Sequence, residues 1–217
     1  DTPDLLSLNT VEILRCQGAK HTGILAMEIY TPGHCVRQED LERQQAQPGK
    51  YTVGLGQEEI GFCGDDEDAV SMALTVVSRL MEKYDIDWHQ IGRLEVGTES
   101  LTDRSKSIKT HLMSLFAEHN NFNIEGVDTY NACYGGTAAL FNTVSWCQSD
   151  AWDGRYGLVV CVDIADLNED QRFLNGAAAV AMLVGHDAAL SLLPERASHM
   201  MNTWDFYKPV GWEDSYP

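Results

Sequence analysis

Long apolar runs and positive charge are both scarce in this sequence. No apolar stretch approaches the roughly 18 residues that a membrane-spanning helix requires. The longest runs, Gly157–Val162 and Ala177–Val184, have the length of buried strands. Lysine and arginine number 15 against 33 aspartate and glutamate residues, so the formal net charge is −18. Because an acidic surface repels phosphate backbones and anionic lipids, we expect neither nucleic acid nor a membrane as a partner.

The cysteines lack the spacing of a metal site. All six are spread along the chain without a C-x-x-C pair, and none of the seven histidines stands with a cysteine as a zinc-ligand pair. A secreted disulfide scaffold would be shorter and richer in cysteine. We therefore predict a reduced, intracellular protein without a metal, and place it in the cytoplasm.

What the chain does have is enough apolar material for one core. Its 217 residues are 44% hydrophobic, which suits one sizeable domain and excludes a disordered chain. The polar segment 1–21 lacks the apolar centre of a signal peptide, so we expect an N-terminal extension there and a folded domain over 22–217. The missing initiator methionine and the trailing end at Pro217 suggest a chain cut at both ends.

Apolar runs and helical periodicity alternate along the chain. Strands are predicted at Gly23–Tyr30, Ile91–Thr98, Gly126–Asn131, Gly157–Asp163 and Ala177–Val184. Helices are predicted at Asp65–Tyr84, Asp103–His119 and Gly135–Asp150, the first with Asp65 and Asp66 as candidate caps. The stretch after Tyr30, through Pro48-Gly49, is predicted to be irregular. The order βαβαβαββ predicts an α/β layered domain with a mostly parallel sheet.

Reactive side chains follow two of the predicted strands. Glu99 comes after the strand at Ile91–Thr98, and Cys133 comes after the strand at Gly126–Asn131. Parallel α/β sheets place their sites beyond the carboxyl ends of the strands, so we expect both side chains at one sheet edge.

Cys133 lies where a strand turns into a helix. The positive end of the helix dipole favours a thiolate there. Gly135 and Gly136 would let a ligand approach the backbone, and their N–H groups would steady an oxyanion. The alternative is a buried structural cysteine.

Glu99 and Lys50 are weaker signals when taken alone. A carboxylate partly removed from water at Glu99 would have a raised pKa, in the range useful for proton transfer; the alternative is a solvated loop glutamate. Lys50 is a cation in a glycine-containing loop and would meet a phosphate; the alternative is a solvated lysine. Glu95, inside the predicted strand, is a lesser candidate.

Several segments together resemble eukaryotic 3-hydroxy-3-methylglutaryl-CoA synthases of the thiolase superfamily. They are Gly49–Gln57, Ile91–Ser100, Ser105–Thr110, Glu125–Asp128, Asn131–Leu140 and Trp152–Tyr156. The combination of EVGTES and NACYGGTAAL is specific, and the match runs from about Thr22 to the end. The resemblance implies a thiolase-like fold, of which this chain would be a single βαβαβαββ half.

The resemblance also implies the chemistry. Acetyl-CoA and acetoacetyl-CoA would condense in the mevalonate pathway of isoprenoid and sterol biosynthesis. Cys133 matches the nucleophile that takes the acetyl group, and Glu99 matches the general acid/base. The loop Pro48, Gly49 and Lys50 matches a segment that contacts CoA. The CoA thioesters are substrates, so no separate cofactor is implied, and family members pair as homodimers.

Two departures from the family pattern keep other readings open. The family's substrate loop resembles G-N-A-R-P-T-G-G-A, whereas Asp170–Ala177 has Gln171 and Asn175 at the expected Asn and Thr positions. Trp204–Pro209 resembles the run that leads into a second half, which would carry the family's catalytic histidine. The alternatives are another thiolase-fold acyltransferase and a non-catalytic remnant that pairs with a full-length partner.

Overall fold

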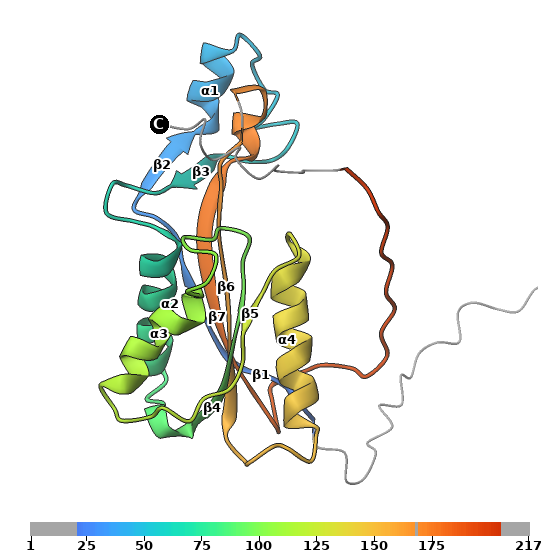
Figure 1. Ribbon diagram of the computed structural model, residues 1–217. Helices are drawn as coiled ribbons and strands as arrows, with labels where there is room; N and C mark the ends of the chain where they lie inside the picture. The colour runs from blue at the N-terminus through green and yellow to red at the C-terminus, as the bar shows by residue number, and fades with distance from the viewer. Residues whose placement is uncertain (1–20, 168, 205–217) are drawn as a thin grey trace, which may run out of the picture.

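The computed structural model describes residues 21–167 and 169–204 (Figure 1). The expected N-terminal extension lies outside the described residues except for His21. The run Trp204–Pro209, which resembles the family's link to a second half, also lies outside them except for Trp204. The remaining predicted elements all fall within the described part of the chain.

The core of the fold is one mixed sheet. Its strands are β1 (Gly23–Tyr30), β4 (Ile91–Gly97), β5 (Asp128–Thr129), β6 (Tyr156–Ala165), β7 (Gly176–Gly185) and β8 (Leu190–Ser191). They lie in the order β5-β4-β6-β7-β1-β8. β4 pairs in parallel with β5 and β6, whereas β7 is antiparallel to β6 and β1, and β8 to β1. Within the described residues, β1, β4, β5 and β6 therefore share one direction, which confirms the mostly parallel, mixed sheet.

Helices cover both faces of this sheet (Figure 1). α2 (Ala69–Lys83) and α3 (Ile108–Ala117) pack on one face, and α4 (Tyr134–Cys147) packs on the other. The strands alternate accordingly: Leu158 and Val160 of β6 join the α2 and α3 core, whereas Val159 joins the core under α4. The predicted order βαβαβαββ is confirmed, with further short elements inserted.

Both helices on the first face start later than predicted. The α2 cap is Asp68, because Ser71 offers it both an N–H (2.6 Å) and a hydroxyl that accepts the Asp68 N–H (2.8 Å). The proposed caps Asp65 and Asp66 were therefore wrong. α3 starts at Ile108 because Ser107 caps it and the Asp128 carboxylate accepts the Ile108 and Lys109 N–H groups at 2.6 and 3.0 Å.

A small lobe, residues 34–62, projects beyond the sheet (Figure 1). It contains β2 (His34–Arg37), α1 (Gln38–Gln44) and β3 (Glu59–Phe62), with β2 and β3 paired antiparallel. The prediction of an irregular stretch here was wrong. Tyr51 of the lobe stacks on Phe173 with ring centroids 4.8 Å apart. Phe173 belongs to the 3-10 helix η2 (Glu169–Leu174), so this stack connects the lobe to the segment between β6 and β7.

Candidate active site

Cys133 and Glu99 face each other at the end of β4 and β5. The Cys133 Sγ lies 3.8 Å from the Glu99 Oε1. β4 and β5 are parallel neighbours that pair Gly97 with Thr129, so the loops that leave them emerge side by side. The predicted juxtaposition is confirmed. The Cys133 residue is exposed and Glu99 is half-buried, which leaves the thiol open to a ligand.

The turn that carries Cys133 is sharply bent. Ala132 adopts a left-handed conformation with φ of 44°, which is unfavourable for a residue with a Cβ. Cys133 itself is the N-cap of α4, with φ of −62° and ψ of −16°. The thiol therefore stands at the positive end of a 14-residue helix, as the sequence predicts.

The two glycines after Cys133 lie against other parts of the protein. A Cβ on Gly135 would lie 2.6 Å from the Thr129 carbonyl oxygen, and one on Gly136 would lie 2.8 Å from the Cys161 Sγ. The Gly135 N–H also donates to the Ala132 carbonyl at 3.1 Å. Both glycines let α4 approach the sheet, and the Gly135 N–H is already engaged within the turn; that the Gly136 N–H steadies an oxyanion stays a prediction.

Gly97 completes this contact from the strand side. A Cβ there would lie 2.4 Å from the Gly136 Cα, inside the closest distance that real Cβ contacts reach. The end of β4 and the first turn of α4 thus touch through their main chains. This contact fixes the distance between the strand that leads to Glu99 and the helix that starts at Cys133.

The backbone that carries Glu99 is held by one carboxylate on the neighbouring strand. The Asp163 Oδ1 accepts the Glu99 N–H at 2.7 Å and the Ser100 N–H and Oγ each at 3.1 Å. It also accepts the Thr98 hydroxyl at 3.2 Å. The sequence analysis missed Asp163. The available signal was its place at the carboxyl end of β6, which is also a parallel neighbour of β4.

Glu95 is a buried structural carboxylate rather than a second reactive one. Its side chain has no exposed surface and receives the Arg93 guanidinium at 2.6 Å. The Thr129 hydroxyl donates to it at 3.4 Å. Beside it, Lys109 donates to the carbonyls of Ile124 and Gly126 at 3.0 and 2.8 Å, and burial lowers the pKa of this lysine. The Thr129 contact joins β5 to β4, and the Lys109 contacts join the segment before β5 to α3.

The loop Pro48, Gly49 and Lys50 is organised by Glu42 of α1. The buried Glu42 carboxylate accepts the N–H groups of Gly49 (2.8 Å), Tyr51 (2.7 Å) and Thr52 (2.7 Å). These donors favour the ionised form and lower the pKa of Glu42 to about 2. Lys50 is exposed, with its Nζ 5.4 Å from the Tyr51 ring centroid.

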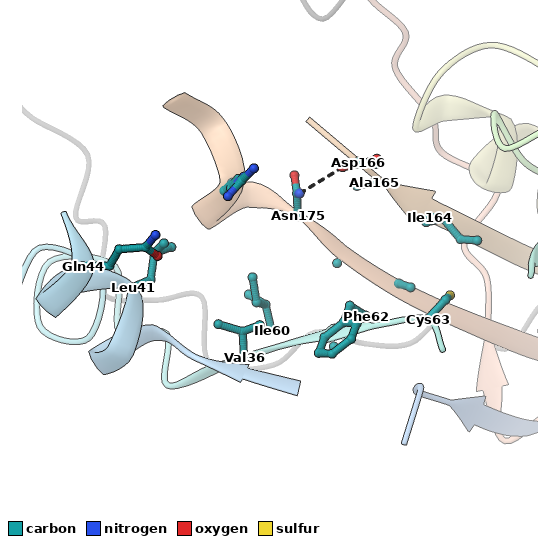
Figure 2. Close-up of a pocket in the computed structure, with 14 residues that line it drawn as sticks. Val36, Leu41, Gln44, Ile60, Phe62, Cys63, Ile164, Ala165, Asp166 and Asn175 are labelled. Carbon is teal, nitrogen blue, oxygen red and sulfur yellow. Dashed lines mark hydrogen bonds between the residues drawn. The ribbon is translucent and has the colours of Figure 1, made fainter. Parts of the chain in front are cut away.

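Two hollows at the lobe are relevant to ligand binding. A polar hollow of about 460 Å³ is lined by Leu41, Gln44, Gln45, Gln47, Lys50, Tyr51 and Arg172. Figure 2 shows the second, a more apolar cavity of about 420 Å³, with Val36, Ile60 and Phe62 of the lobe on one side and Ile164 and Asn175 on the other. Neither lining includes Cys133 or Glu99, so Lys50 shares neither of these hollows with those two residues.

The stretch that departs from the family pattern borders this apolar cavity. The Asn175 amide oxygen accepts the Leu167 N–H at 2.8 Å, and its amide nitrogen donates to the Asp166 Oδ1 at 3.3 Å (Figure 2). Asn175 therefore closes the loop between β6 and β7 with its own side chain.

The described ranges contain neither a group of metal ligands nor a helix that could span a membrane. Across residues 21–167 and 169–204, no three His, Cys, Asp or Glu side chains are grouped to hold a metal ion. None of the helices in those same ranges combines the length and the apolarity needed to cross a membrane.

The mixed sheet between two helical layers is a thiolase-like fold. A thiol at the start of α4 and a carboxylate beside it form the candidate site on this fold. Residues 18–189 match the model of the family described as hydroxymethylglutaryl-coenzyme A synthase N terminal. The chain belongs to the hydroxymethylglutaryl-CoA synthase family, of which it represents the N-terminal region.

Individual relatives agree with this assignment. The chain is 54% identical over 193 residues to the mitochondrial hydroxymethylglutaryl-CoA synthase of Homo sapiens, covering 88% of this chain and 38% of that protein. It is also 54% identical to the cytoplasmic synthase of Gallus gallus, covering 88% and 37%. The chain thus spans well under half the length of these curated relatives.

Solved structures show the same architecture. MvaS in complex with 3-hydroxy-3-methylglutaryl coenzyme A superposes with a TM-score of 0.81 at 38% identity, covering 89% of this chain and 47% of that one. The HMG synthase of the curacin biosynthetic pathway, in complex with an acetyl donor-ACP, superposes at 0.68 with 26% identity, covering 76% and 41%.

Proposed function

We propose that this chain supplies the acetyl-accepting site of a hydroxymethylglutaryl-CoA synthase. The observation that carries the proposal is the 3.8 Å separation between the Cys133 Sγ and the Glu99 Oε1. The Cys133 thiolate attacks the carbonyl carbon of acetyl-CoA, a new thioester bond forms, and CoA leaves as a thiolate that takes up a proton.

Glu99 performs the next step in this proposal. Its carboxylate removes a proton from the methyl group of the acetyl-cysteine, and the resulting carbanion attacks the ketone carbon of acetoacetyl-CoA. Glu99 then returns the proton to the new alkoxide, and water hydrolyses the thioester to Cys133, which releases the product as a carboxylate and restores the thiol. A carboxylate beside the thiol favours this chemistry over that of acyltransferases that decarboxylate a malonyl donor, because those need no base for a methyl group.

The remaining parts of the proposal come from the resemblance and from the relatives. Acetyl-CoA and acetoacetyl-CoA are the proposed substrates, Pro48, Gly49 and Lys50 contact CoA, no separate cofactor is needed, and the protein acts as a homodimer in the mevalonate pathway. The matched relatives are named both mitochondrial and cytoplasmic, so the cytoplasmic location stays a prediction from composition.

The two roles can be tested separately with acetyl-CoA alone. Radiolabelled acetyl-CoA is expected to label the chain on Cys133, and Cys133→Ser is expected to remove the label. When the acetylated chain stands in D2O, Glu99 is expected to exchange the methyl protons for deuterium, detected by mass spectrometry of the released acetyl group. Glu99→Gln should keep the label and lose the exchange. A folded chain that takes no label would overturn the proposal.

A further inference from the structure

The chain enters and leaves the 34–62 lobe through a neck of two adjacent segments. β2 and β3 pair antiparallel with His34 opposite Phe62. The segment that enters the lobe at Gly33 and the segment that leaves it at Gly64 therefore run side by side. They also touch, since a Cβ on Gly64 would lie 3.2 Å from the His34 Cε1. The angle between the lobe and the sheet therefore depends on how this neck is held.

One carboxylate holds both segments of the neck. Glu67, between β3 and α2, accepts the Gly64 N–H at 2.9 Å and also the hydroxyl of Tyr30. The Gly33 N–H is a further donor, and these hydrogen bonds lower the pKa of Glu67 because they favour its ionised form. Glu67 thus connects the last residue of β1, the entry to the lobe and the exit from it.

The groups around Glu67 are themselves fixed to α2. The Arg79 guanidinium of α2 lies over the Tyr30 ring, 4.9 Å from its centroid. Asp68, the next residue after Glu67, is the N-cap of α2 and exchanges two hydrogen bonds with Ser71. Because its surroundings belong to the sheet and to α2, Glu67 is a fixed point to which the neck is attached.

The lobe has a second attachment on its other side, at η2. The Gln38 amide nitrogen donates to the Phe173 carbonyl at 3.2 Å, and Tyr51 stacks on the same phenylalanine. The apolar cavity of Figure 2 lies between the two attachments, with Cys63 close to the neck and Leu41 of α1 at the opposite end. A change in the angle of the lobe would therefore alter this cavity and move the loop that follows α1.

We propose that Glu67 is a positioning residue that fixes the angle between the 34–62 lobe and the sheet. In its consequence for the reaction this rests on the proposed function, in which the loop after α1 contacts CoA while the acetyl group is transferred to Cys133. Without Glu67 the lobe takes further orientations, and the apparent affinity for acetyl-CoA falls in proportion to the fraction of molecules that keep the competent one. The chemistry at Cys133 is unchanged.

Two exposed thiols allow the angle to be measured as a distance. Cys35 lies in β2 of the lobe and Cys133 at the sheet edge, and both are exposed. Nitroxide labels on these two, with Cys16 changed to serine in every sample, give a distance distribution by double electron–electron resonance. Burial raises the pKa of the other described thiols, which therefore react slowly with the label: Cys63, Cys147 and Cys161.

The distance distribution is expected to change when the neck loses its acceptor. Wild type should give one narrow distribution. In Glu67→Ala three donors lose a charged acceptor, so about half to nine-tenths of the molecules should show other distances. Glu67→Gln keeps one acceptor oxygen, should show a smaller change, and serves the same comparison if the alanine variant does not fold. Glu28→Gln is the matched control, because Glu28 also joins β1 to α2, through Lys83 at 2.6 Å, but stands outside the neck.

Acetylation of the unlabelled full chain gives the second readout. Glu67→Ala should need about 2- to 10-fold more acetyl-CoA for half-maximal labelling of Cys133, with the same maximal rate. S-acetyl-N-acetylcysteamine carries the acetyl thioester without the nucleotide, so it should label the variant and wild type at equal rates.

The two readouts separate this inference from the proposed function. A single narrow distance in Glu67→Ala, identical to that of wild type, overturns the inference and leaves the proposed function intact. Equal slowing with both acetyl donors also overturns it, since Glu67 then acts on the fold as a whole. If wild type takes no label from either donor, the proposed function fails, and the distance distributions still decide whether Glu67 holds the lobe.

Discussion

The loop that carries Glu99 and the 34–62 lobe are both organised by one carboxylate, yet they differ in the other contacts that support them. In each, one carboxylate gathers backbone N–H groups: Asp163 for the loop of Glu99, and Glu42 for the loop of Lys50. The end of β4, which leads into the Glu99 loop, is also fixed by a main-chain contact between Gly97 and Gly136. The lobe instead depends on side chains, above all the Tyr51–Phe173 stack. The two regions should therefore respond differently to substitution.

The largest effect is expected from adding a methyl group at the main-chain contact. In Gly97→Ala, the new Cβ meets backbone atoms of Gly135 and Gly136 at 2.4–2.6 Å, so α4 has to move. We expect the free energy of unfolding to fall by about 1–3 kcal/mol and Cys133 acetylation to slow by about 100-fold. Gly33→Ala is the control, because its Cβ would have no neighbour within 4 Å. Normal acetylation in Gly97→Ala would show that the contact does not position Cys133.

A smaller effect on chemistry is expected at Asp163. Asp163→Ala removes the acceptor of the Glu99 and Ser100 N–H groups, so deuterium exchange into the acetyl group should slow by about 10- to 100-fold. Asp163→Asn keeps an oxygen acceptor and should recover most of the rate. The rate at which acetyl-CoA labels Cys133 reports on acetylation separately from proton exchange and should be nearly unchanged. Equal loss of both readouts would assign Asp163 to the fold rather than to Glu99.

The lobe should lose stability in a pH-dependent way when Glu42 is changed. The folded pKa of Glu42 is lowered from 4.5 to about 2, so its ionised form stabilises the fold above pH 4.5, and this contribution disappears as the pH falls toward 2. In Glu42→Gln the amide NH2 replaces one acceptor oxygen, so at least one of the backbone N–H groups loses its hydrogen bond. We expect Tm at pH 7 to fall on the order of 5 °C, and the two proteins to converge near pH 2. A pH-independent difference would contradict this.

The smallest effect is expected at Ala132. Ala132→Gly relieves the left-handed conformation, worth about 1–2 kcal/mol, but adds unfolded-state entropy of about 0.5–1 kcal/mol. The net gain in unfolding free energy, measured by urea denaturation, should lie between zero and about 1.5 kcal/mol. Ala138→Gly, in the interior of the helix α4 that follows this turn, is the control and should destabilise by about 1 kcal/mol. A destabilised Ala132→Gly would show that the turn is not strained.

Much of the sheet could be predicted because its strands are continuous apolar runs. The bounds of β1 match the predicted Gly23–Tyr30, and β7 differs from Ala177–Val184 by one residue at each end. The juxtaposition of Cys133 and Glu99 follows from the same logic, since strand ends in a parallel sheet share an edge. Their catalytic roles stay predictions.

The lobe could not be predicted because its signals are not local. All four residues of β2 are exposed, and α1 consists mainly of polar residues, so neither shows an apolar period. Its order comes from Glu42 bonding to residues seven to ten positions later. Asp163 was missed for a related reason: its role depends on β6 lying beside β4, and no local pattern specifies that pairing.

The contact between Gly97 and Gly136 also constrains how this site can diversify. Since two main chains already touch there, any side chain added at that junction displaces Cys133 relative to Glu99. The 34–62 lobe and the η2 segment that carries Arg172 and Phe173 meet through side chains instead, so substitutions there do not force two main chains apart. Substitutions intended to change the surroundings of Cys133 and Glu99 should therefore be made in those two segments, with the glycines of the junction left unchanged.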